Sequence, residues 1–333
     1  MSKETVVALI GAGGIAEFHL PALLTTGARV VVWSQEGAPE LVRRFGGEIA
    51  GSFEEALGVA DVVDVATPTD THHALASAAL LAGKDVILEK PVARTAEQVS
   101  DLRRLSAETG RRVFPGHVVR YFPEYATLHA AVRDKVAGEL AVLRFVRSGA
   151  FPARSAWFAD PARSGGIILD LMIHDIDIAR WIAGEVRRVS AVARRIDSEG
   201  DVCEAAHVLL EHDSGAITHV AGVWGPPHID FTTEYSVAGT GGVLSHSSSA
   251  TKGLVADVRP GGGPPPSVPA SASATSPFAL EVADFLRARE AGEDARVTFE
   301  DGARAAEIAL AAIESTTTGQ PVLLDAVGAG TRG

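Results

Sequence analysis

The first third of the chain alternates short hydrophobic runs with amphipathic segments. Up to about residue 115, runs rich in valine and isoleucine are separated by stretches of mixed polar and apolar residues. This alternation is typical of a parallel sheet flanked by helices, whose strands are hydrophobic throughout because both faces are buried. The expected strands are Thr5–Ile10, Val30–Trp33, Val62–Ala66, Val86–Leu88 and Arg112–Phe114.

Capping residues mark two helix starts in this region. Ser52 stands three positions before Glu55, and Thr95 stands three positions before Gln98. In such a capping box the hydroxyl accepts a hydrogen bond from an amide of the first turn. The spacing therefore predicts helices over Phe53–Val59 and Ala96–Glu108.

After residue 120 the pattern changes to longer strand-like runs that follow one another with turns between them. The runs are Leu140–Ser148, Val186–Arg195, His207–Glu211, Ile217–Val223 and Tyr235–Ala238. Successive strands without intervening helices predict a mostly antiparallel sheet. A stretch rich in glycine, proline and serine over residues 261–276 predicts a surface loop, and helical spacing returns at Phe278–Arg289 and Asp301–Thr316.

Composition limits the possible function classes. The 333 residues exceed one ordinary core, so two domains are expected. A net charge of -12 argues against nucleic acid and anionic membranes as partners. Cys203 is the only cysteine, which rules out an internal disulfide and favours a reducing, cytoplasmic location. No stretch reaches the ~20 apolar residues of a membrane span.

A glycine-rich turn follows the first expected strand. Gly11-Ala-Gly-Gly-Ile-Ala16 opens a helical segment, as a dinucleotide-binding turn does. Gly11 permits the tight turn, Gly13 lets the main chain approach a pyrophosphate, and Ala16 takes the place of the third glycine. Amides at the helix start, from Gly14 and Ile15 onward, would hold the phosphates.

The second strand ends without the acidic residue that normally binds the ribose of NAD. Its end reads Trp33-Ser34-Gln35. Ser34 can donate to a 2′-phosphate without the repulsion of a carboxylate, which favours NADP over NAD. No arginine follows directly, however, and Glu36 offers a carboxylate for the ribose, so both cofactors remain open.

Two further strand ends carry polar residues. Thr67 and Pro68 follow the strand at Val62–Ala66, and Glu89-Lys90-Pro91 follows the next one. Ligands of open parallel sheets bind at the carboxyl ends of the strands, so these residues are candidates by position. A lysine there can stabilise an alkoxide or hold a substrate hydroxyl.

An acid and a histidine stand four residues apart within apolar sequence further along the chain. Asp170 and His174 would share one face of a helix, and they are preceded by Gly165-Gly166. The pair suits acid–base chemistry, since an imidazole exchanges protons near neutral pH. A metal site is the alternative, because Asp177 extends the face and His117 offers a fourth ligand. The positive charge of Lys90 argues against a metal ion, and no metal ligand is predicted.

Four motifs, taken in order, resemble those of the Gfo/Idh/MocA oxidoreductases. They are Gly11-Ala-Gly-Gly-Ile-Ala16, Thr67-Pro68 with His72, Glu89-Lys90-Pro91, and Gly165-Gly166 followed by Asp170 and His174. Weaker similarities occur at Gly116 with Arg120, and at Trp157-Phe158. The resemblance implies an α/β chain with a Rossmann NAD(P)-binding domain over residues 1–118. A substrate-binding and oligomerisation domain with an open, mostly antiparallel sheet would cover residues 119–333.

The resemblance also implies roles for individual residues. Lys90, Asp170 and His174 are the expected catalytic residues. The residues expected to bind NAD or NADP are Gly11, Gly13, Gly14, Ile15, Ser34, Thr67, Pro68, His72, Glu89 and Lys90. Those expected to bind substrate are Lys90, His117, Arg120, Trp157, Asp170 and His174, although His117 and Arg120 suit a packing role equally well.

The expected function is interconversion of a secondary hydroxyl and a ketone on a sugar, cyclitol or related polyol. Two alternatives remain. A redox-neutral glycosidase or epimerase would use the same residues with tightly held NAD, and a non-catalytic regulator would only sense the nucleotide. An open sheet face needs covering, which predicts a homodimer or homotetramer.

Overall fold

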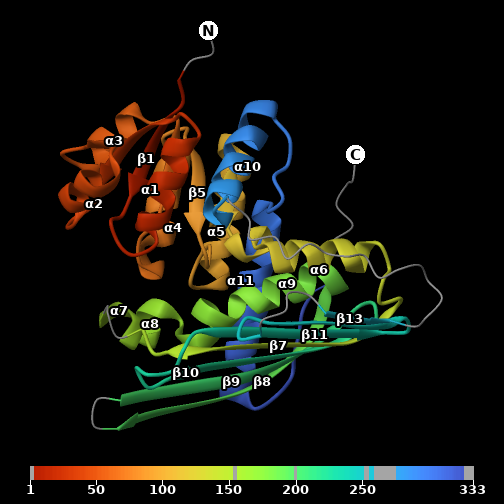
Figure 1. Ribbon diagram of the computed structural model, residues 1–333. Coiled ribbons are helices and arrows are strands. Elements are labelled where there is room, and N and C mark those ends of the chain that lie inside the picture. Colours follow the sequence, from red (N-terminus) through yellow and green to blue (C-terminus); the bar gives the residue numbers. More distant parts are fainter. Residues whose placement is uncertain (1–3, 153–155, 199–200, 251–254, 259–274, 326–333) are drawn as a thin grey trace. The chain divides into compact units, whose positions relative to one another are not determined.

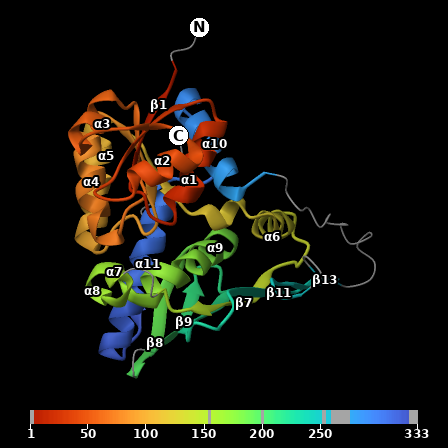
Figure 2. The ribbon, with the colours of Figure 1, turned by 60° about the vertical axis from the view of Figure 1, so that its left-hand side comes forward.

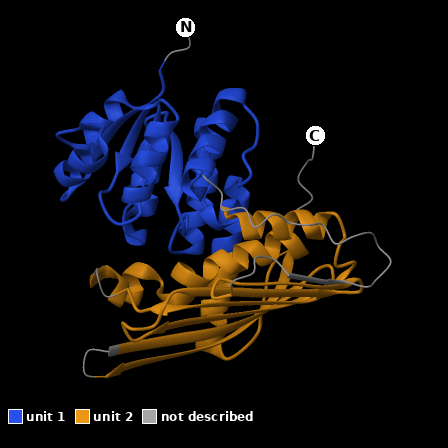
Figure 3. Cartoon of the chain, in the orientation of Figure 1, with its two compact units in different colours: residues 1–121, 273–306 blue, residues 122–272, 307–333 orange. Residues whose placement is uncertain are grey.

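The chain forms two compact units (Figure 3). Unit 1 contains residues 1–121 and 273–306, and unit 2 contains residues 122–272 and 307–333. The computed structural model describes residues 4–152, 156–198, 201–250, 255–258 and 275–325. Most of the loop predicted over residues 261–276 therefore lies outside the described residues.

Unit 1 is built on a six-stranded parallel sheet with the strand order β3-β2-β1-β4-β5-β6. This order is that of the Rossmann fold, and helices flank the sheet (Figure 1). The strands are β1 Val6–Ile10, β2 Arg29–Trp33, β3 Glu48–Ile49, β4 Val62–Val65, β5 Asp85–Glu89 and β6 Val113–Gly116. The helices are α1 Ala16–Thr25, α2 Ala38–Phe45, α3 Phe53–Val59, α4 His72–Leu81 and α5 Ala96–Thr109, with 3-10 turns at Thr69–Thr71 and Val118–Tyr121.

The predicted parallel sheet and both capping boxes are confirmed. The Ser52 hydroxyl accepts from the Glu55 amide at 3.1 Å, and the Thr95 hydroxyl accepts from the Gln98 amide at 3.2 Å. Strand β3 was not predicted, because its two residues are exposed and form no hydrophobic run.

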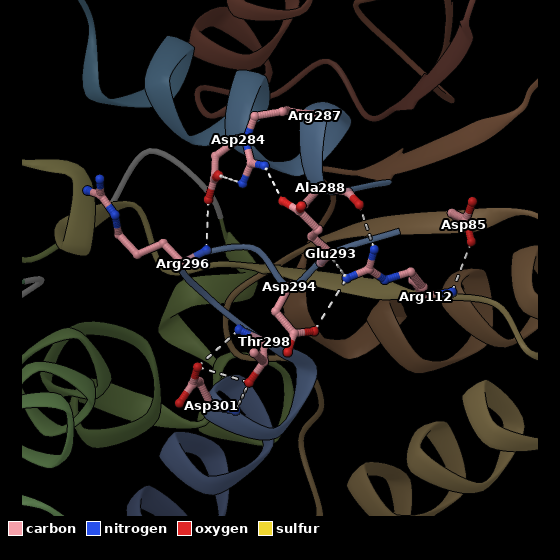
Figure 4. Close-up of polar contacts among 10 residues, drawn as sticks. All are labelled: Asp85, Arg112, Asp284, Arg287, Ala288, Glu293, Asp294, Arg296, Thr298 and Asp301. Carbon is pink, nitrogen blue, oxygen red and sulfur yellow. Dashed lines mark hydrogen bonds and ion pairs between the residues drawn. The ribbon is translucent and has the colours of Figure 1, made fainter. Parts of the chain in front are cut away.

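A C-terminal segment returns to unit 1 and packs against α1 and β6. Helix α10 (Pro277–Ala291) packs against α1, and its Phe285 ring stacks on Phe114 with the centroids 5.4 Å apart. The Arg112 guanidinium donates to the carbonyls of Ala288, at 2.8 Å, and Glu293 (Figure 4). The structure thus assigns residues 273–306 to unit 1, a return that the predicted division at residue 118 does not contain.

Unit 2 contains an eight-stranded sheet with the order β13-β12-β11-β7-β10-β9-β8-β14. Only the β7–β10 pair is parallel among the described pairings, so the predicted mostly antiparallel sheet is confirmed. The strands are β7 Leu140–Ala150, β8 Val186–Ser198, β9 Asp201–His212, β10 Ile217–Gly225, β11 Thr232–Gly239, β12 Gly242–Ser247, β13 Val255–Val258 and β14 Val322–Leu323. The sequence did not predict β12, β13 or β14.

Helices cover one face of this sheet. Helix α9 (Ile173–Ala183) packs on β7 and β10, and α6 (Pro123–Arg133) lies beside it (Figure 2). Short helices α7 (Ala156–Ala159) and α8 (Pro161–Ser164) precede a π-helix at Ile168–Met172. Helix α11 (Phe299–Thr318) begins in unit 1 and ends in unit 2. Within the described ranges, no helix is both long enough and apolar enough to span a bilayer.

Candidate functional site

The glycine-rich turn between β1 and α1 has the backbone that a dinucleotide requires. Gly11 has a φ of +114°, and a Cβ at this position would lie 2.2 Å from the Ala66 carbonyl oxygen. A Cβ on Gly13 or Gly14 would meet no described heavy atom within 4 Å. The fold therefore requires glycine at position 11, because no side chain fits there. The main chain at Gly13 and Gly14, in contrast, is open to a ligand.

The two kinds of glycine are expected to respond differently to substitution. Gly11→Ala forces a side chain against a carbonyl at positive φ, so the free energy of unfolding should fall by roughly 1–3 kcal/mol or more. Gly13→Ala should leave unfolding unchanged and weaken NAD(P) binding by at least tenfold. Urea titration and calorimetric cofactor titration measure the two effects. Equal loss of stability in both variants would contradict this reading of the turn.

The end of β2 carries the residue that bears on cofactor choice. Ser34 is half-buried after Trp33, and Glu36 is exposed. The two arginines of α2 already bind carboxylates: Arg43 pairs with Glu40, and Arg44 pairs with Glu17 at 2.7 Å. Both pairs are exposed and contribute little to stability. The predicted preference for NADP stays a prediction.

His72 joins the turns that follow β4 and β5. Its imidazole is buried, with Nδ1 2.8 Å from the Pro91 carbonyl oxygen and Nε2 2.9 Å from the Thr67 carbonyl oxygen. The Thr67 hydroxyl in turn lies 2.7 Å from the Thr71 hydroxyl. His72 therefore ties together two of the turns predicted to hold the cofactor, and its own predicted contact with the cofactor stays a prediction.

Glu89 ends β5 inside the protein rather than at its surface. One carboxylate oxygen lies 3.1 Å from Nε2 of His19, and the other accepts the Lys90 amide at 3.1 Å. A Cβ on Gly116 would stand 2.9 Å from the first oxygen, so glycine in β6 provides the space for it. The predicted binding of cofactor by Glu89 stays a prediction. Lys90 itself is half-buried at the strand end.

His19, Asp64 and Glu281 form the buried surroundings of Glu89, and the sequence did not single them out. Glu281, from α10, is fully buried, and neither of its oxygens has a hydrogen-bond partner among the described residues. Burial, reinforced by the charges of Glu89 and Asp64, raises the pKa of Glu281 well above its ordinary value. Folding therefore favours the neutral, protonated form of the Glu281 carboxyl.

Glu281→Gln is expected to stabilise the protein increasingly as the pH rises. A carboxyl whose pKa is raised by folding contributes stability that is present in acid and lost as the pH rises towards the folded pKa. Between the pKa of the unfolded state and that of the folded state, the loss amounts to about 1.4 kcal/mol for each pH unit. Glutamine does not titrate, so the variant does not lose this stability. The Tm difference between variant and wild type, measured from pH 5 to pH 8, should therefore grow. Glu290→Gln, on the exposed side of α10, is the matched control, and a difference that does not change with pH would refute the assignment.

In unit 2, Asp170 and His174 lie on either side of a change in helical geometry. Asp170 is buried within the π-helix Ile168–Met172, and His174 is half-buried in the first turn of α9. The predicted regular helix is therefore wrong at Asp170, where the wider turn changes the relative direction of the two side chains. Such π-turns occur frequently at functional sites.

Two glycines with positive φ precede this helix. Gly165 and Gly166 have φ values of +84° and +69°. A Cβ on Gly166 would lie 2.8 Å from Oε1 of Glu204, the oxygen that accepts the Ile167 amide at 2.8 Å. Glu204 thus satisfies an amide at the start of the helix from the neighbouring strand β9. No local sequence pattern indicates this role, because Ile167 and Glu204 are 37 positions apart.

Asp175 forms a buried ion pair with Arg147 of β7. The guanidinium donates to both carboxylate oxygens, at 2.9 Å and 2.8 Å, and both side chains are buried. Burial lowers the pKa of Arg147, but the Asp175 charge outweighs this effect and raises it. Asp175 and Asp177 therefore lie in the interior and not at the helix surface, since both are about 1% exposed.

The remaining predicted substrate residues lie in different surroundings. Trp157 is half-buried and stacks on Phe158 with the centroids 3.9 Å apart. Arg120 is buried in unit 1, where its guanidinium lies 3.2 Å from Asp301 and also donates to the Arg296 carbonyl. His117 is buried directly after β6. Their predicted roles in substrate binding stay predictions.

No cluster of three or more histidine, cysteine, aspartate or glutamate side chains suited to a metal ion occurs in the part of the chain that the structure describes. The alternative of a metal site at Asp170, His174 and Asp177 therefore gains no support from the described residues.

Comparison with known proteins identifies both parts of the chain. Residues 5–117 match the model of an oxidoreductase family with an NAD-binding Rossmann fold, and residues 125–245 match the GFO/IDH/MocA C-terminal domain. A scyllo-inositol 2-dehydrogenase (NAD(+)) from Bacillus subtilis (strain 168) is 30% identical, with 98% of each chain covered. An inositol 2-dehydrogenase from Rhizobium meliloti (strain 1021) is 27% identical, covering 92% of this chain and 95% of that protein.

A solved structure shares the fold along nearly the whole chain. The crystal structure of GenD2 from gentamicin A biosynthesis, in complex with NAD, superposes with a TM-score of 0.82 at 25% identity, covering 98% of both chains. The two family matches agree with the observed fold. Unit 1 has the Rossmann strand order, and unit 2 has a mostly antiparallel sheet. The chain is a nicotinamide-dependent oxidoreductase that belongs to the Gfo/Idh/MocA family.

Proposed function

We propose that this oxidoreductase interconverts a secondary hydroxyl and a ketone on a cyclitol, sugar or related polyol. The observation that carries the proposal is the presence of Lys90 at the end of β5 and of Asp170 and His174 around the π-turn, in a chain that aligns along 98% of its length with an inositol dehydrogenase. A lysine, an acid and a histidine provide the charge and proton transfer that oxidation of an alcohol needs.

Each residue has a distinct part in the proposed reaction. His174 removes the hydroxyl proton, because an imidazole accepts a proton near neutral pH and returns it during ketone reduction. The Lys90 ammonium stabilises the negative charge that develops on the substrate oxygen. Asp170 orients the substrate through its hydroxyls. The nicotinamide, when bound, accepts or donates the hydride.

Unit 1 supplies the binding features for that cofactor. The open main chain at Gly13 and Gly14 and the amides at the start of α1 suit a pyrophosphate. Ser34, without a carboxylate at the ribose position, favours NADP. The ratio of kcat/KM for NADP and NAD tests this preference, and a ratio below one would reverse it.

The function is tested by following near-ultraviolet absorbance of the nicotinamide with cyclitols, aldoses and uronic acids as substrates. We expect reduction of NAD or NADP with at least one polyol. Cofactor retained through purification, with product formed but no net nicotinamide reduction, would instead indicate the redox-neutral glycosidase or epimerase. Nucleotide-dependent binding of a partner protein without turnover would indicate a regulator.

We also propose that a second copy of the chain covers the exposed face of the unit 2 sheet, giving a homodimer or homotetramer. Large apolar side chains on adjacent strands are exposed there: Val142 by 51%, Val192 by 67%, Leu209 by 40% and Ile217 by 42%. An apolar patch of this kind is typical of an interface. Light scattering should show an oligomer that Leu209→Glu with Ile217→Glu converts to a monomer, and a monomeric wild type would refute the proposal.

A further inference from the structure

His19 occupies an unusual place for a histidine, in the interior of unit 1 on the helix that follows the glycine-rich turn. It lies in the first turns of α1 and is fully buried. Its Nδ1 is 2.9 Å from Oδ2 of Asp64 in β4, and its Nε2 is 3.1 Å from Oε1 of Glu89 in β5. One side chain therefore links α1 to β4 and β5, the two strands that Thr67 and Lys90 follow.

The two partners of the ring determine its charge. Carboxylate oxygens accept hydrogen bonds, so both ring nitrogens must carry protons for both bonds to form. Burial alone would lower the pKa of His19, but the charges and hydrogen bonds of Asp64 and Glu89 outweigh it and hold the pKa well above its ordinary value. His19 is therefore an imidazolium at neutral pH.

Glu89 transmits the effect of His19 to the strand end. Burial would raise the pKa of Glu89, but the hydrogen bond and charge of His19 lower it, so the side chain is a carboxylate. Its second oxygen accepts the Lys90 amide at 3.1 Å, and its charge also interacts with the Lys90 ammonium. Without the imidazolium, the buried Glu89 carboxylate would lose its ionic partner His19. The carboxylate would then no longer be held where it accepts the Lys90 amide.

We propose that His19 is a positioning residue for Lys90: the imidazolium holds the Glu89 carboxylate, and this carboxylate fixes the main chain from which the lysine acts. The inference rests on the proposed function of Lys90. It extends that function to a residue that touches neither substrate nor cofactor.

His19→Gln in the full chain tests the proposal by two independent measurements. Amide hydrogen exchange reports the position of Lys90 directly, because its N–H is the one that Glu89 accepts. We expect the Lys90 amide to exchange about tenfold faster, while Ile87, within the preceding strand β5, keeps its protection. Among the kinetic constants, kcat should fall about 10- to 100-fold, whereas the cofactor KM changes less than threefold.

His73→Gln is the matched control, since His73 pairs with Asp101 at 2.9 Å in the same unit but outside the network. It should leave both measurements unchanged. If His19→Gln does not fold, Glu89→Gln removes the same ionic pair with little change in volume and should also speed Lys90 exchange. Unaltered Lys90 exchange, or equal loss of protection at Ile87, would overturn the proposal. If the wild type turns over no polyol, the proposed function fails while the exchange result still decides the role of His19.

Discussion

Lys90→Met is expected to lower kcat by about 1,000-fold on any polyol that the wild type oxidises, because the substrate alkoxide loses its only proposed cationic partner. Methionine keeps the length and apolar character of the side chain, so the half-buried position stays filled. Cofactor affinity should change much less, since the glycine turn and α1 remain intact. Steady-state kinetics with saturating cofactor and calorimetric cofactor titration measure the two effects.

Lys84→Met provides the control for this substitution. Lys84 precedes the opposite end of strand β5, where its ammonium donates to the Ala60 carbonyl at 2.6 Å. The kcat of Lys84→Met should stay within twofold of the wild-type value. If the single variants Lys90→Met and His174→Ala both retained near-normal turnover, the proposed acid–base assignment would be wrong.

Arg147→Met is expected to destabilise unit 2 by about 3–5 kcal/mol, because it leaves Asp175 as an unpaired charge in the interior. The double variant Arg147→Met with Asp175→Leu removes both charges and should recover most of this loss. Urea unfolding followed by tryptophan fluorescence suits the measurement, since three of the four tryptophans, Trp157, Trp181 and Trp224, belong to unit 2.

An exposed pair in the same sheet shows what burial contributes. Arg188 pairs with Glu211 at 2.9 Å, with the arginine side chain 45% exposed. Arg188→Met should cost no more than about 1 kcal/mol. A double variant as unstable as Arg147→Met alone would show that packing of the arginine, rather than its charge, accounts for the loss.

The sequence predicted those parts of the fold in which burial leaves a local pattern. Parallel strands covered on both faces give continuous apolar runs, and all five predicted strands of unit 1 are present. Strands β3 and β14 have two residues each, too few for any pattern. The return of α10 to unit 1 was equally hidden, because an amphipathic helix shows that it packs on something without showing on what.

The same difference separates the predicted from the unpredicted parts of the candidate site. Gly11 and Gly13 could be identified because the strand–turn–helix motif is contiguous in sequence. The buried surroundings of Glu89 could not be identified in this way. His19 stands 70 positions before Glu89, and Glu281 lies far after it, in α10, so no contiguous motif connects them. The π-helix at Asp170 packs closely on β10, since a Cβ on Gly222 would lie 2.5 Å from Met172, and a contact between residues so far apart leaves no local sequence pattern.

Transfer of deuterium from a hydroxyl-bearing carbon to the nicotinamide tests the proposed hydride transfer most directly. The enzyme is incubated with NAD or NADP and with inositols and sugars that carry deuterium on the hydroxyl-bearing carbons, and the cofactor is analysed by mass spectrometry. We expect one deuterium on the reduced nicotinamide for each ketone formed, and loss of this transfer in Lys90→Met. Substrate converted without any deuterium reaching the bound cofactor would contradict the proposed hydride transfer.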